Sequence, residues 1–246
     1  MIVVVPAAPP RAELVPSTLV DATPLTEAEA ARLTEAALID VLRAAASSGG
    51  DLLVNYRDEE TLPDEYAGDG PEAELRAVTV DALGGTDDVR FERQVGSTLA
   101  ARIGNTVTHL LEREGAQSVG ICDPTAPLVA RTEIDGAAMA LRRHDVVLGP
   151  TDGGEVYFSG FAEPIDFEDA YGTPALSTLA RRVEGADLSL GFAPMLPTIT
   201  SESGLASTIA GLEARLVAGR PGGEATAEVV ADLGLYVALD GSIEIE

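Results

Sequence analysis

The sequence contains no lysine. All 16 of its basic residues are arginine, and they stand against 41 acidic residues, which gives a formal net charge of −25 over 246 residues. Such a surface repels itself strongly in dilute buffer, whereas at about 1 M salt the screening length falls to about 3 Å and most of the repulsion disappears. We interpret the composition as that of a cytoplasmic protein from a salt-accumulating halophile; an acidic protein of a mesophile is the alternative. Nucleic acid and anionic membranes are poor partners in either case.

Other residue types are scarce as well. Tryptophan is absent and aromatic residues make up 4% of the chain, so Val, Leu, Ile and Ala must fill the core. The single cysteine, Cys122, excludes an internal disulfide and a thiolate metal cluster. No apolar run reaches the ~18 residues of a membrane span, and the opening MIVVV lacks the basic start of a signal peptide. The length suits one large α/β domain, or two small ones, inside the cell.

Short apolar runs alternate with helical patterns along the chain. Strands are expected at 2–5, 51–56, 76–80, 91–95, 118–122, 145–149, 155–161 and 189–194; helices at 26–49, 97–113, 132–143, from 173 onward and at 203–216; and loops at 6–24 and 58–74. This alternation predicts a three-layer α/β fold, with a mixed, mainly parallel sheet flanked by helices. The run 155–161 follows its predecessor too closely for a helical crossover, so we expect it to pair antiparallel or to form an edge.

The C-terminal region carries a hairpin signal. Asp240-Gly241 separates two alternating runs, which is typical of a tight β-hairpin, and RPGG at 220–223 is interpreted as a linker to it. We therefore expect one domain over 1–219 and a C-terminal extension over 220–246. No Ser-His-Asp ordering, Walker loop or Gly-x-Gly-x-x-Gly fingerprint occurs.

Two acidic residues follow predicted strands. Asp123 comes directly after 118–122, and Asp152 lies in PTDGG, shortly after 145–149. Ligands of parallel sheets bind beyond the carboxyl ends of the strands. If the two strands are neighbours, both carboxylates face one crevice and provide hard oxygen ligands for Mg²⁺ or Mn²⁺. The alternative is that Asp123-Pro124 and Asp152-Gly153 are ordinary turn dipeptides.

Three sequence blocks carry a family resemblance: QVGSTLAARI (94–103), SVGICDPTAPL (118–128) and HDVVLGPTDGGEVYFSGF (144–161), followed by YGTP (171–174). Over about residues 94–175 their order and spacing resemble an uncharacterised family of the nucleotide-diphospho-sugar transferase (GT-A) superfamily, often labelled radical-SAM/selenodomain-associated transferase. A more distant relative by fold is 2-phospho-lactate guanylyltransferase. The matching positions are Gln94, Gly96, Leu99, Arg102, Gly120, Asp123, Pro124, Leu128, Gly149, Pro150, Asp152, Gly153 and Gly154.

The resemblance implies a GT-A-like domain that transfers a glycosyl or nucleotidyl group from a nucleotide-sugar or nucleoside triphosphate. It also implies Mg²⁺ or Mn²⁺ at Asp123. The implied site comprises Asp123 and Asp152 as catalytic residues, Arg11, Gln94 and Arg102 as nucleotide or phosphate ligands, and Pro150, Gly153, Gly154 and Glu155 as the acceptor pocket. The composition would make the chain a haloarchaeal-type member.

The chain also departs from the family pattern. The basic stretch expected after the first strand is replaced by PAAPPRAELVPSTL (6–19), which keeps only Arg11. The usual Asp-Cys-Pro order is Cys122-Asp123-Pro124, a later Asp-x-Asp-Thr motif is Thr198-Ile199-Thr200-Ser201, and Glu155 replaces a tyrosine. Each lost charge-assisted contact is worth about 1.5–3 kcal/mol. These losses favour the alternative function, a catalytically inactive GT-A-like binding or assembly protein.

Overall fold

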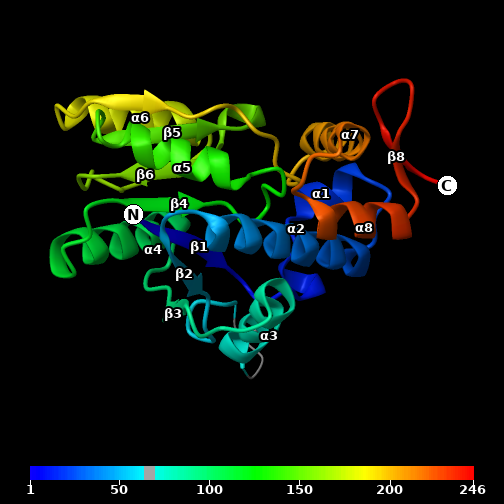
Figure 1. The fold of residues 1–246 in the computed structure, drawn as a ribbon, viewed down its shortest axis with the longest axis horizontal. Coiled ribbons are helices and arrows are strands. Elements are labelled where there is room, and N and C mark those ends of the chain that lie inside the picture. Colours follow the sequence, from blue (N-terminus) through cyan, green and yellow to red (C-terminus); the bar gives the residue numbers. More distant parts are fainter. Residues whose placement is uncertain (64–69) are drawn as a thin grey trace.

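Runs of β-branched and aliphatic residues form the central sheet of the computed structural model, which describes residues 1–63 and 70–246 (Figure 1). The strand order is β3-β2-β1-β4-β6-β5-β7. The strands are β1 Ile2–Ala7, β2 Asp51–Tyr56, β3 Val89–Arg93, β4 Val119–Cys122, β5 Val146–Pro150, β6 Val156–Phe161 and β7 Leu190–Phe192. Every pairing is parallel except those of β6, which runs antiparallel to β4 and β5. The predicted fold class and the antiparallel direction of 155–161 are therefore confirmed.

Eight α-helices and a hairpin complete the described part of the chain. The helices are α1 Ser17–Ala22, α2 Glu27–Ser47, α3 Pro71–Leu83, α4 Leu99–Thr108, α5 Arg131–Ala140, α6 Ala175–Gly185, α7 Glu202–Ala218 and α8 Glu224–Asp232. Short helical turns are η1 Ala12–Leu14, η3 His109–Arg113 and η4 Asp152–Gly154, and the hairpin is β8 Leu235–Val237 with β9 Ile243–Ile245. A capping box between Thr26 and Glu29 begins α2, and the hairpin turns at Gly241 as expected.

Four sequence predictions are corrected, the last of them in part. The strand expected at 76–80 lies inside α3, because Pro71 starts a helix and Gly84 ends it with a φ of 79°, and the buried Leu75 and Val78 share one helical face. The loop expected over 6–24 contains η1 and α1. The linker expected at 220–223 leads into α8, not directly into the hairpin. Of the loop expected over 58–74, residues 71–74 belong to α3 and residues 64–69 lie outside the described residues.

The strands of the parallel half are buried on both faces. In β1, Val3 and Val5 pack into one core with α2, α3 and α5, whereas Val4 packs into the opposite core with α4 and α6. Successive strand residues point to opposite faces, so an uninterrupted apolar run suits a sheet that is covered on both sides. The continuous apolar sequence of the strands therefore explains why helices cover both faces of the sheet.

A third core lies beyond the carboxyl ends of the strands. The second half of α2 packs on the sheet, but its first half extends past the strand ends and contacts α1, α7 and the hairpin through Leu33 and Ala37 (Figure 1). Leu205 and Ile209 of α7 and Leu235 of β8 join this core. The first half of α2 therefore forms a wall beside the edge of the sheet where ligands are expected.

The C-terminal segment is attached to α2 by a buried carboxylate. Asp40 accepts hydrogen bonds from the N–H groups of Ala225 and Thr226 at 3.0 and 2.8 Å and from the Thr226 hydroxyl at 2.7 Å. Burial raises the pKa of Asp40, and the hydrogen bonds from Thr226 and Ala225 offset part of that rise. Residues 220–246 therefore pack against the rest of the chain; their separation as an extension stays a prediction.

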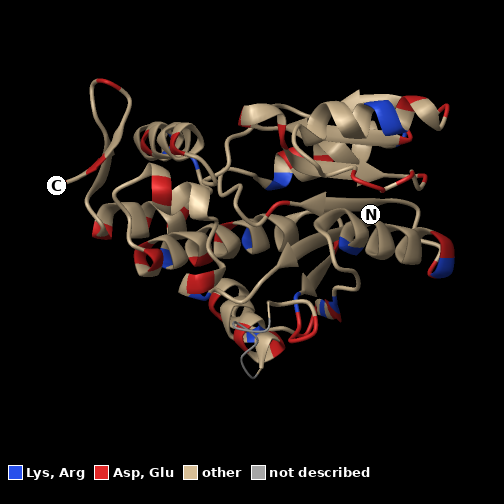
Figure 2. Ribbon diagram, turned by 180° about the vertical axis from the view of Figure 1, so that it is seen from behind, with Lys and Arg blue, Asp and Glu red and all other residues tan. Residues whose placement is uncertain are grey.

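Acidic positions are spread over helices and loops, with scattered arginines between them (Figure 2). Among the helices of the described residues, none has the length and apolar character that crossing a membrane requires.

Replacing Asp40 with alanine should lower the free energy of unfolding by about 1–3 kcal/mol, because the N-terminal N–H groups of α8 lose a buried acceptor. Urea unfolding measures the loss. The matched control is Asp232→Ala, which removes an exposed ion pair with Arg32 at 3.3 Å and should cost less than about 1 kcal/mol. Equal losses in the two variants would contradict the role given to Asp40.

Candidate functional site

A cavity of about 350 Å³ opens at the carboxyl ends of the parallel strands. Its walls come from the loop after β1, the first half of α2, the ends of β2 and β4, the start of α4, and β6. Its ionisable lining residues are Arg11, Glu35, Arg57, Arg102, Asp123, Glu155, Tyr157 and Tyr171. The remaining lining is mostly apolar, which is typical of a small-molecule site with a few polar groups that fix orientation.

Asp123 occupies the position that the sequence predicts, at the end of β4. Its Oδ1 accepts hydrogen bonds from the N–H and the hydroxyl of Thr125 at 2.8 and 2.6 Å. Its own N–H donates to the carbonyl of Tyr157 on β6. Burial raises the pKa of Asp123, the Thr125 hydrogen bonds oppose the rise, and the negative charge of Glu155 adds to it. The neighbouring Cys122 is fully buried, as expected of a small core residue.

Glu155 is the second acid of this cavity. It lies between η4 and β6, where the family pattern has a tyrosine, and its charge acts on Asp123. Its Oε1 is buried without a hydrogen-bond partner. A buried carboxylate oxygen without a partner is costly. Asp123 and Glu155 therefore form an acid pair that a cation or a hydrogen-bond donor of a ligand would satisfy.

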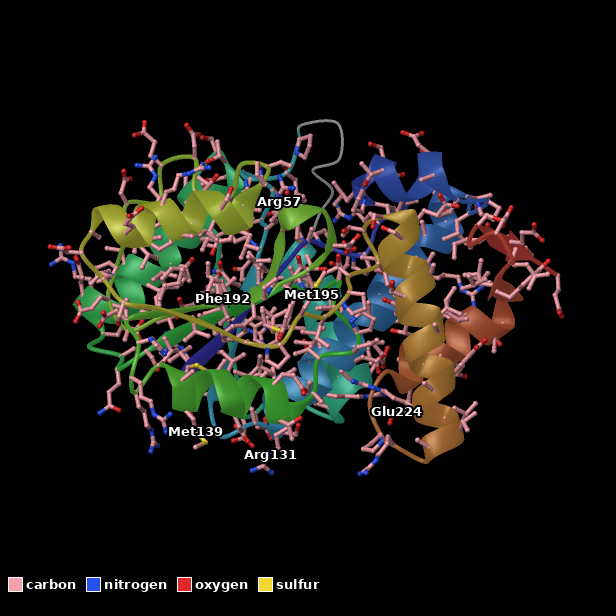
Figure 3. The ribbon with its side chains drawn as sticks, turned by 90° about the horizontal axis from the view of Figure 1, so that it is seen from above. Arg57, Arg131, Met139, Phe192, Met195 and Glu224 are labelled. Carbon is pink, nitrogen blue, oxygen red and sulfur yellow. The ribbon has the colours of Figure 1, made fainter. Side chains whose placement is uncertain are left out.

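Two arginines line the same cavity. Arg57 follows β2 directly, and Figure 3 shows it between the sheet and the helices that extend past it. Arg102 lies in the first turn of α4. Burial lowers the pKa of both guanidinium groups, and the charge of Arg57 lowers that of Arg102 further. Two like charges are therefore held close together in a partly desolvated wall.

Gln94 stands at the end of β3 and is 3% exposed. Its Nε2 donates to the carbonyl of Asn55 at 2.7 Å, while its Oε1 is buried without a partner. Among the residues that the structure describes, five buried side-chain polar atoms lack a partner, and four of them belong to cavity residues: Arg57, Gln94, Arg102 and Glu155. Buried polar atoms without partners are rare in folded proteins, so their concentration here marks a ligand site.

Arg11 also lines the cavity, but it is already engaged. Its Nη2 donates to Glu74 of α3 at 2.6 Å and its Nε to the same carboxylate at 3.3 Å. The hydrogen bond and charge of Glu74 raise the pKa of Arg11 despite the opposing effect of burial. A guanidinium paired with a carboxylate offers less charge to a phosphate, so the phosphate-binding role of Arg11 stays a prediction.

Asp152 is placed differently from Asp123. The strands β4 and β5 are not neighbours, because β6 lies between them, and Asp152 is not among the described residues that line the cavity. Its Oδ2 accepts from the hydroxyls of Ser201 and Ser203 at 2.6 and 3.0 Å, and its Oδ1 accepts from the Thr151 hydroxyl at 3.0 Å. The condition for the expected convergence of Asp123 and Asp152, that their strands be neighbours, is therefore not met, and the Asp152 carboxylate holds the start of α7; a catalytic role for Asp152 stays a prediction.

The residues around Asp152 form the reversal between β5 and β6. Gly153 and Gly154 have φ values of 69° and 81°, in the left-handed region that favours glycine. They and Pro150 do not appear among the described lining residues of the cavity, whereas Glu155 does. The glycines are therefore needed to turn the chain, and an acceptor-pocket role for Pro150, Gly153 and Gly154 stays a prediction.

The sequence analysis did not identify every residue of the cavity. Arg57 follows a predicted strand as directly as Asp123 does, so the rule that ligands bind beyond the strand ends was sufficient to find it. Tyr171 and Ser159 share a hydrogen bond of 2.5 Å on the cavity wall, and burial raises the pKa of Tyr171 well above its usual range. They lie far apart from Arg57 in sequence, and no pattern links them before folding.

Known structures share this fold. A protein of Desulfovibrio desulfuricans G20 that is assigned to the nucleotide-diphospho-sugar transferases superposes with a TM-score of 0.74 at 17% identity, covering 94% of each chain. A cytidylyltransferase from Leptospira borgpetersenii superposes with a TM-score of 0.50 at 8% identity, covering 94% of this chain and 92% of that one. No protein-family model matches the sequence, and no curated protein matches it. The chain has the nucleotide-diphospho-sugar transferase fold.

Replacing Asp152 with asparagine should destabilise the protein in a pH-dependent way. Burial acts to raise the pKa of Asp152, but the Ser201, Ser203 and Thr151 hydrogen bonds outweigh it and the pKa is lowered. The resulting stability is present above the pKa of the unfolded carboxyl, about 3.9, and is lost as the pH falls through the lower folded value. Unfolding temperatures should therefore differ most between wild type and variant near neutral pH and converge in acid. A difference that is constant with pH would rule out this role.

Proposed function

We propose that the protein transfers a glycosyl or nucleotidyl group from a nucleotide-sugar or nucleoside triphosphate, with Mg²⁺ or Mn²⁺ as cofactor. The observation that carries the proposal is the acid pair Asp123–Glu155 in a cavity at the strand ends of a nucleotide-diphospho-sugar transferase fold. Ligands of open α/β sheets bind at this edge, beside the point where the strand order reverses between β1 and β4. A haloarchaeal-type cytoplasmic origin is part of the proposal and rests on composition.

The donor set fits a divalent ion that is shared with a substrate. Among the described residues, no group of three or more acidic, histidine or cysteine side chains is placed to hold a metal by itself. Mg²⁺ usually binds one or two carboxylates and completes its octahedral shell with water and substrate phosphates. Asp123 and Glu155 would provide these carboxylates, and Glu155 replaces Asp152 as the second acid of the prediction. When bound, the ion would neutralise phosphate oxygens.

The residues of the chain would act by binding and orientation. Thr125 holds Asp123 Oδ1 through two hydrogen bonds, which fixes the carboxylate before a ligand arrives. The apolar lining excludes water, so charges in the cavity interact more strongly than they would in solvent. Transfer would then rest on alignment of the acceptor with the activated group, without a covalent enzyme intermediate.

A second candidate is a catalytically inactive nucleotide-binding or assembly protein of the same fold. The ion pair between Arg11 and Glu74 favours it, because this pair occupies the one base that the loop after β1 retains. Binding without turnover would distinguish this candidate from the transferase. An inactive nucleotide-binding protein should bind nucleotide but should release no pyrophosphate or nucleoside diphosphate with any acceptor.

Mn²⁺ with a nucleoside triphosphate or nucleotide-sugar should raise the unfolding temperature of the wild type by several degrees. Ligand at about 100 times its Kd stabilises the native state by about 2.7 kcal/mol. Asp123→Asn and Glu155→Gln should each lose most of this shift, since each removes a carboxylate ligand. The electron paramagnetic resonance signal of free Mn²⁺ reports binding independently.

Glu163→Gln is the matched control, because Glu163 is exposed and lies outside the cavity; it should keep the full shift. The proposal fails if no nucleotide shifts the wild type, or if all three variants respond alike.

A further inference from the structure

We propose that Arg57 and Arg102 form a subsite that binds a phosphate group directly, without a metal ion. Each residue lines the cavity, and each has a buried Nε atom without a hydrogen-bond partner among residues 1–63 and 70–246. The subsite is distinct from the acid pair and deepens the proposed transferase function, on which its place in a reaction rests.

The two arginines lack a counter-charge within the described residues. Their side chains bond to backbone carbonyl groups: Arg57 donates to the carbonyl of Thr61, and Arg102 donates to that of Ser97 at 3.4 Å. Neither forms an ion pair with a carboxylate in the part of the chain that the structure describes. In a chain with 41 acids and 16 arginines, two neighbouring guanidinium groups in one cavity without a carboxylate partner among the described residues need an external anion.

A phosphate group fits this pair better than a carboxylate does. Two guanidinium groups carry two positive charges and present their donors as planar forks, and a phosphate dianion accepts from both at once. A carboxylate would compensate only half of the charge. Burial lowers the pKa of both arginines, and the charge of Arg57 lowers that of Arg102 further, so a bound dianion would offset the repulsion that acts on Arg102.

The subsite lies apart from the acid pair. Arg57 follows β2, Asp123 follows β4, and β1 runs between these strands. Neighbouring strands are about 4.8 Å apart, so the ends of β2 and β4 are about 10 Å apart. Within the described chain, Asp123 accepts hydrogen bonds from Thr125 and forms no ion pair with an arginine. The cavity therefore has an acidic end and a basic end, and its ligand needs an anionic group at the basic end and a cation or a hydrogen-bond donor at the acidic end.

Gln94 adds a requirement to the ligand. Its Nε2 is used by Asn55, so the buried Oε1 is an acceptor that needs a donor. A hydroxyl or amine group of the ligand supplies one. The ligand class is thus a phosphorylated compound that also carries hydroxyl or amine groups, such as a nucleotide or a sugar phosphate.

The test uses the full-length protein in EDTA, with potassium phosphate replacing KCl at constant ionic strength. Inorganic phosphate should bind to the wild type by calorimetry and raise its unfolding temperature, and acetate should do neither. Arg102→Gln and Arg57→Gln should each weaken phosphate binding by about tenfold or more. Arg181→Gln, which removes the same charge from an exposed position outside the cavity, should leave it unchanged.

Asp123→Asn separates this inference from the proposed function. Phosphate should still bind to Asp123→Asn in EDTA, even if nucleotide with Mn²⁺ fails to bind to any form of the protein; the subsite then stands and the transferase does not. The inference is overturned if phosphate does not bind to the wild type, if acetate binds equally well, or if Arg102→Gln binds phosphate as the wild type does. Should Arg57→Gln not fold because its bond to Thr61 is lost, Arg102→Gln decides.

A competition measurement with Mn²⁺ present then assigns the source of the phosphate. Displacement of phosphate by a nucleoside triphosphate would place a phosphate of the nucleotide on the subsite. Simultaneous binding of both would assign the subsite to a phosphorylated acceptor, and ribose 5-phosphate should then displace phosphate in the same assay. Both results presuppose that Arg57 and Arg102 hold the anion.

Discussion

The length of α2 determines where this protein can bind a ligand. The helix has 21 residues and is about 31 Å long, whereas a strand of six residues spans about 20 Å. A helix that packs against β1 over its second half must therefore extend past the carboxyl ends of the strands. Its first half needs its own apolar partners, which α1, α7, Ile199 and the C-terminal hairpin provide. The cavity lies between this third core and the sheet.

Charge is distributed unequally between the surface and this cavity. The surface is strongly acidic (Figure 2), and among the described residues eight of the 16 arginines form ion pairs with carboxylates. Arg57 and Arg102 form no such pair in the described part of the chain, and the charge of Arg57 acts on Arg102. Desolvated like charges cost stability unless a ligand compensates them, and such strain is found more often at functional sites than elsewhere. Asp123 and Glu155 on the other side of the cavity are likewise two desolvated like charges, here negative, which a bound cation would compensate.

The secondary structure of the sheet could be predicted because its strands are short apolar runs bounded by turns. The capping box at Thr26 and the hairpin at Asp240-Gly241 are local signals, and both are present in the structure. The run 76–80 misled for a physical reason: its β-branched residues favour a strand locally, but Pro71 and Gly84 set the ends of a helix around them. Local propensity gives way where packing and end signals agree.

The sequence by itself determined the fold class, the position of Asp123 at a strand end and the scarcity of bases in the loop after β1, because these depend on residue order and periodicity. Only the tertiary structure decided which acid accompanies Asp123. Because β6 lies between β4 and β5, Asp152 lies at the start of α7, and Glu155, directly before β6, lines the cavity. Strand order and side-chain pairing depend on contacts between distant segments, so no local pattern shows that Arg11 pairs with Glu74 or that Arg57 and Arg102 line the same cavity.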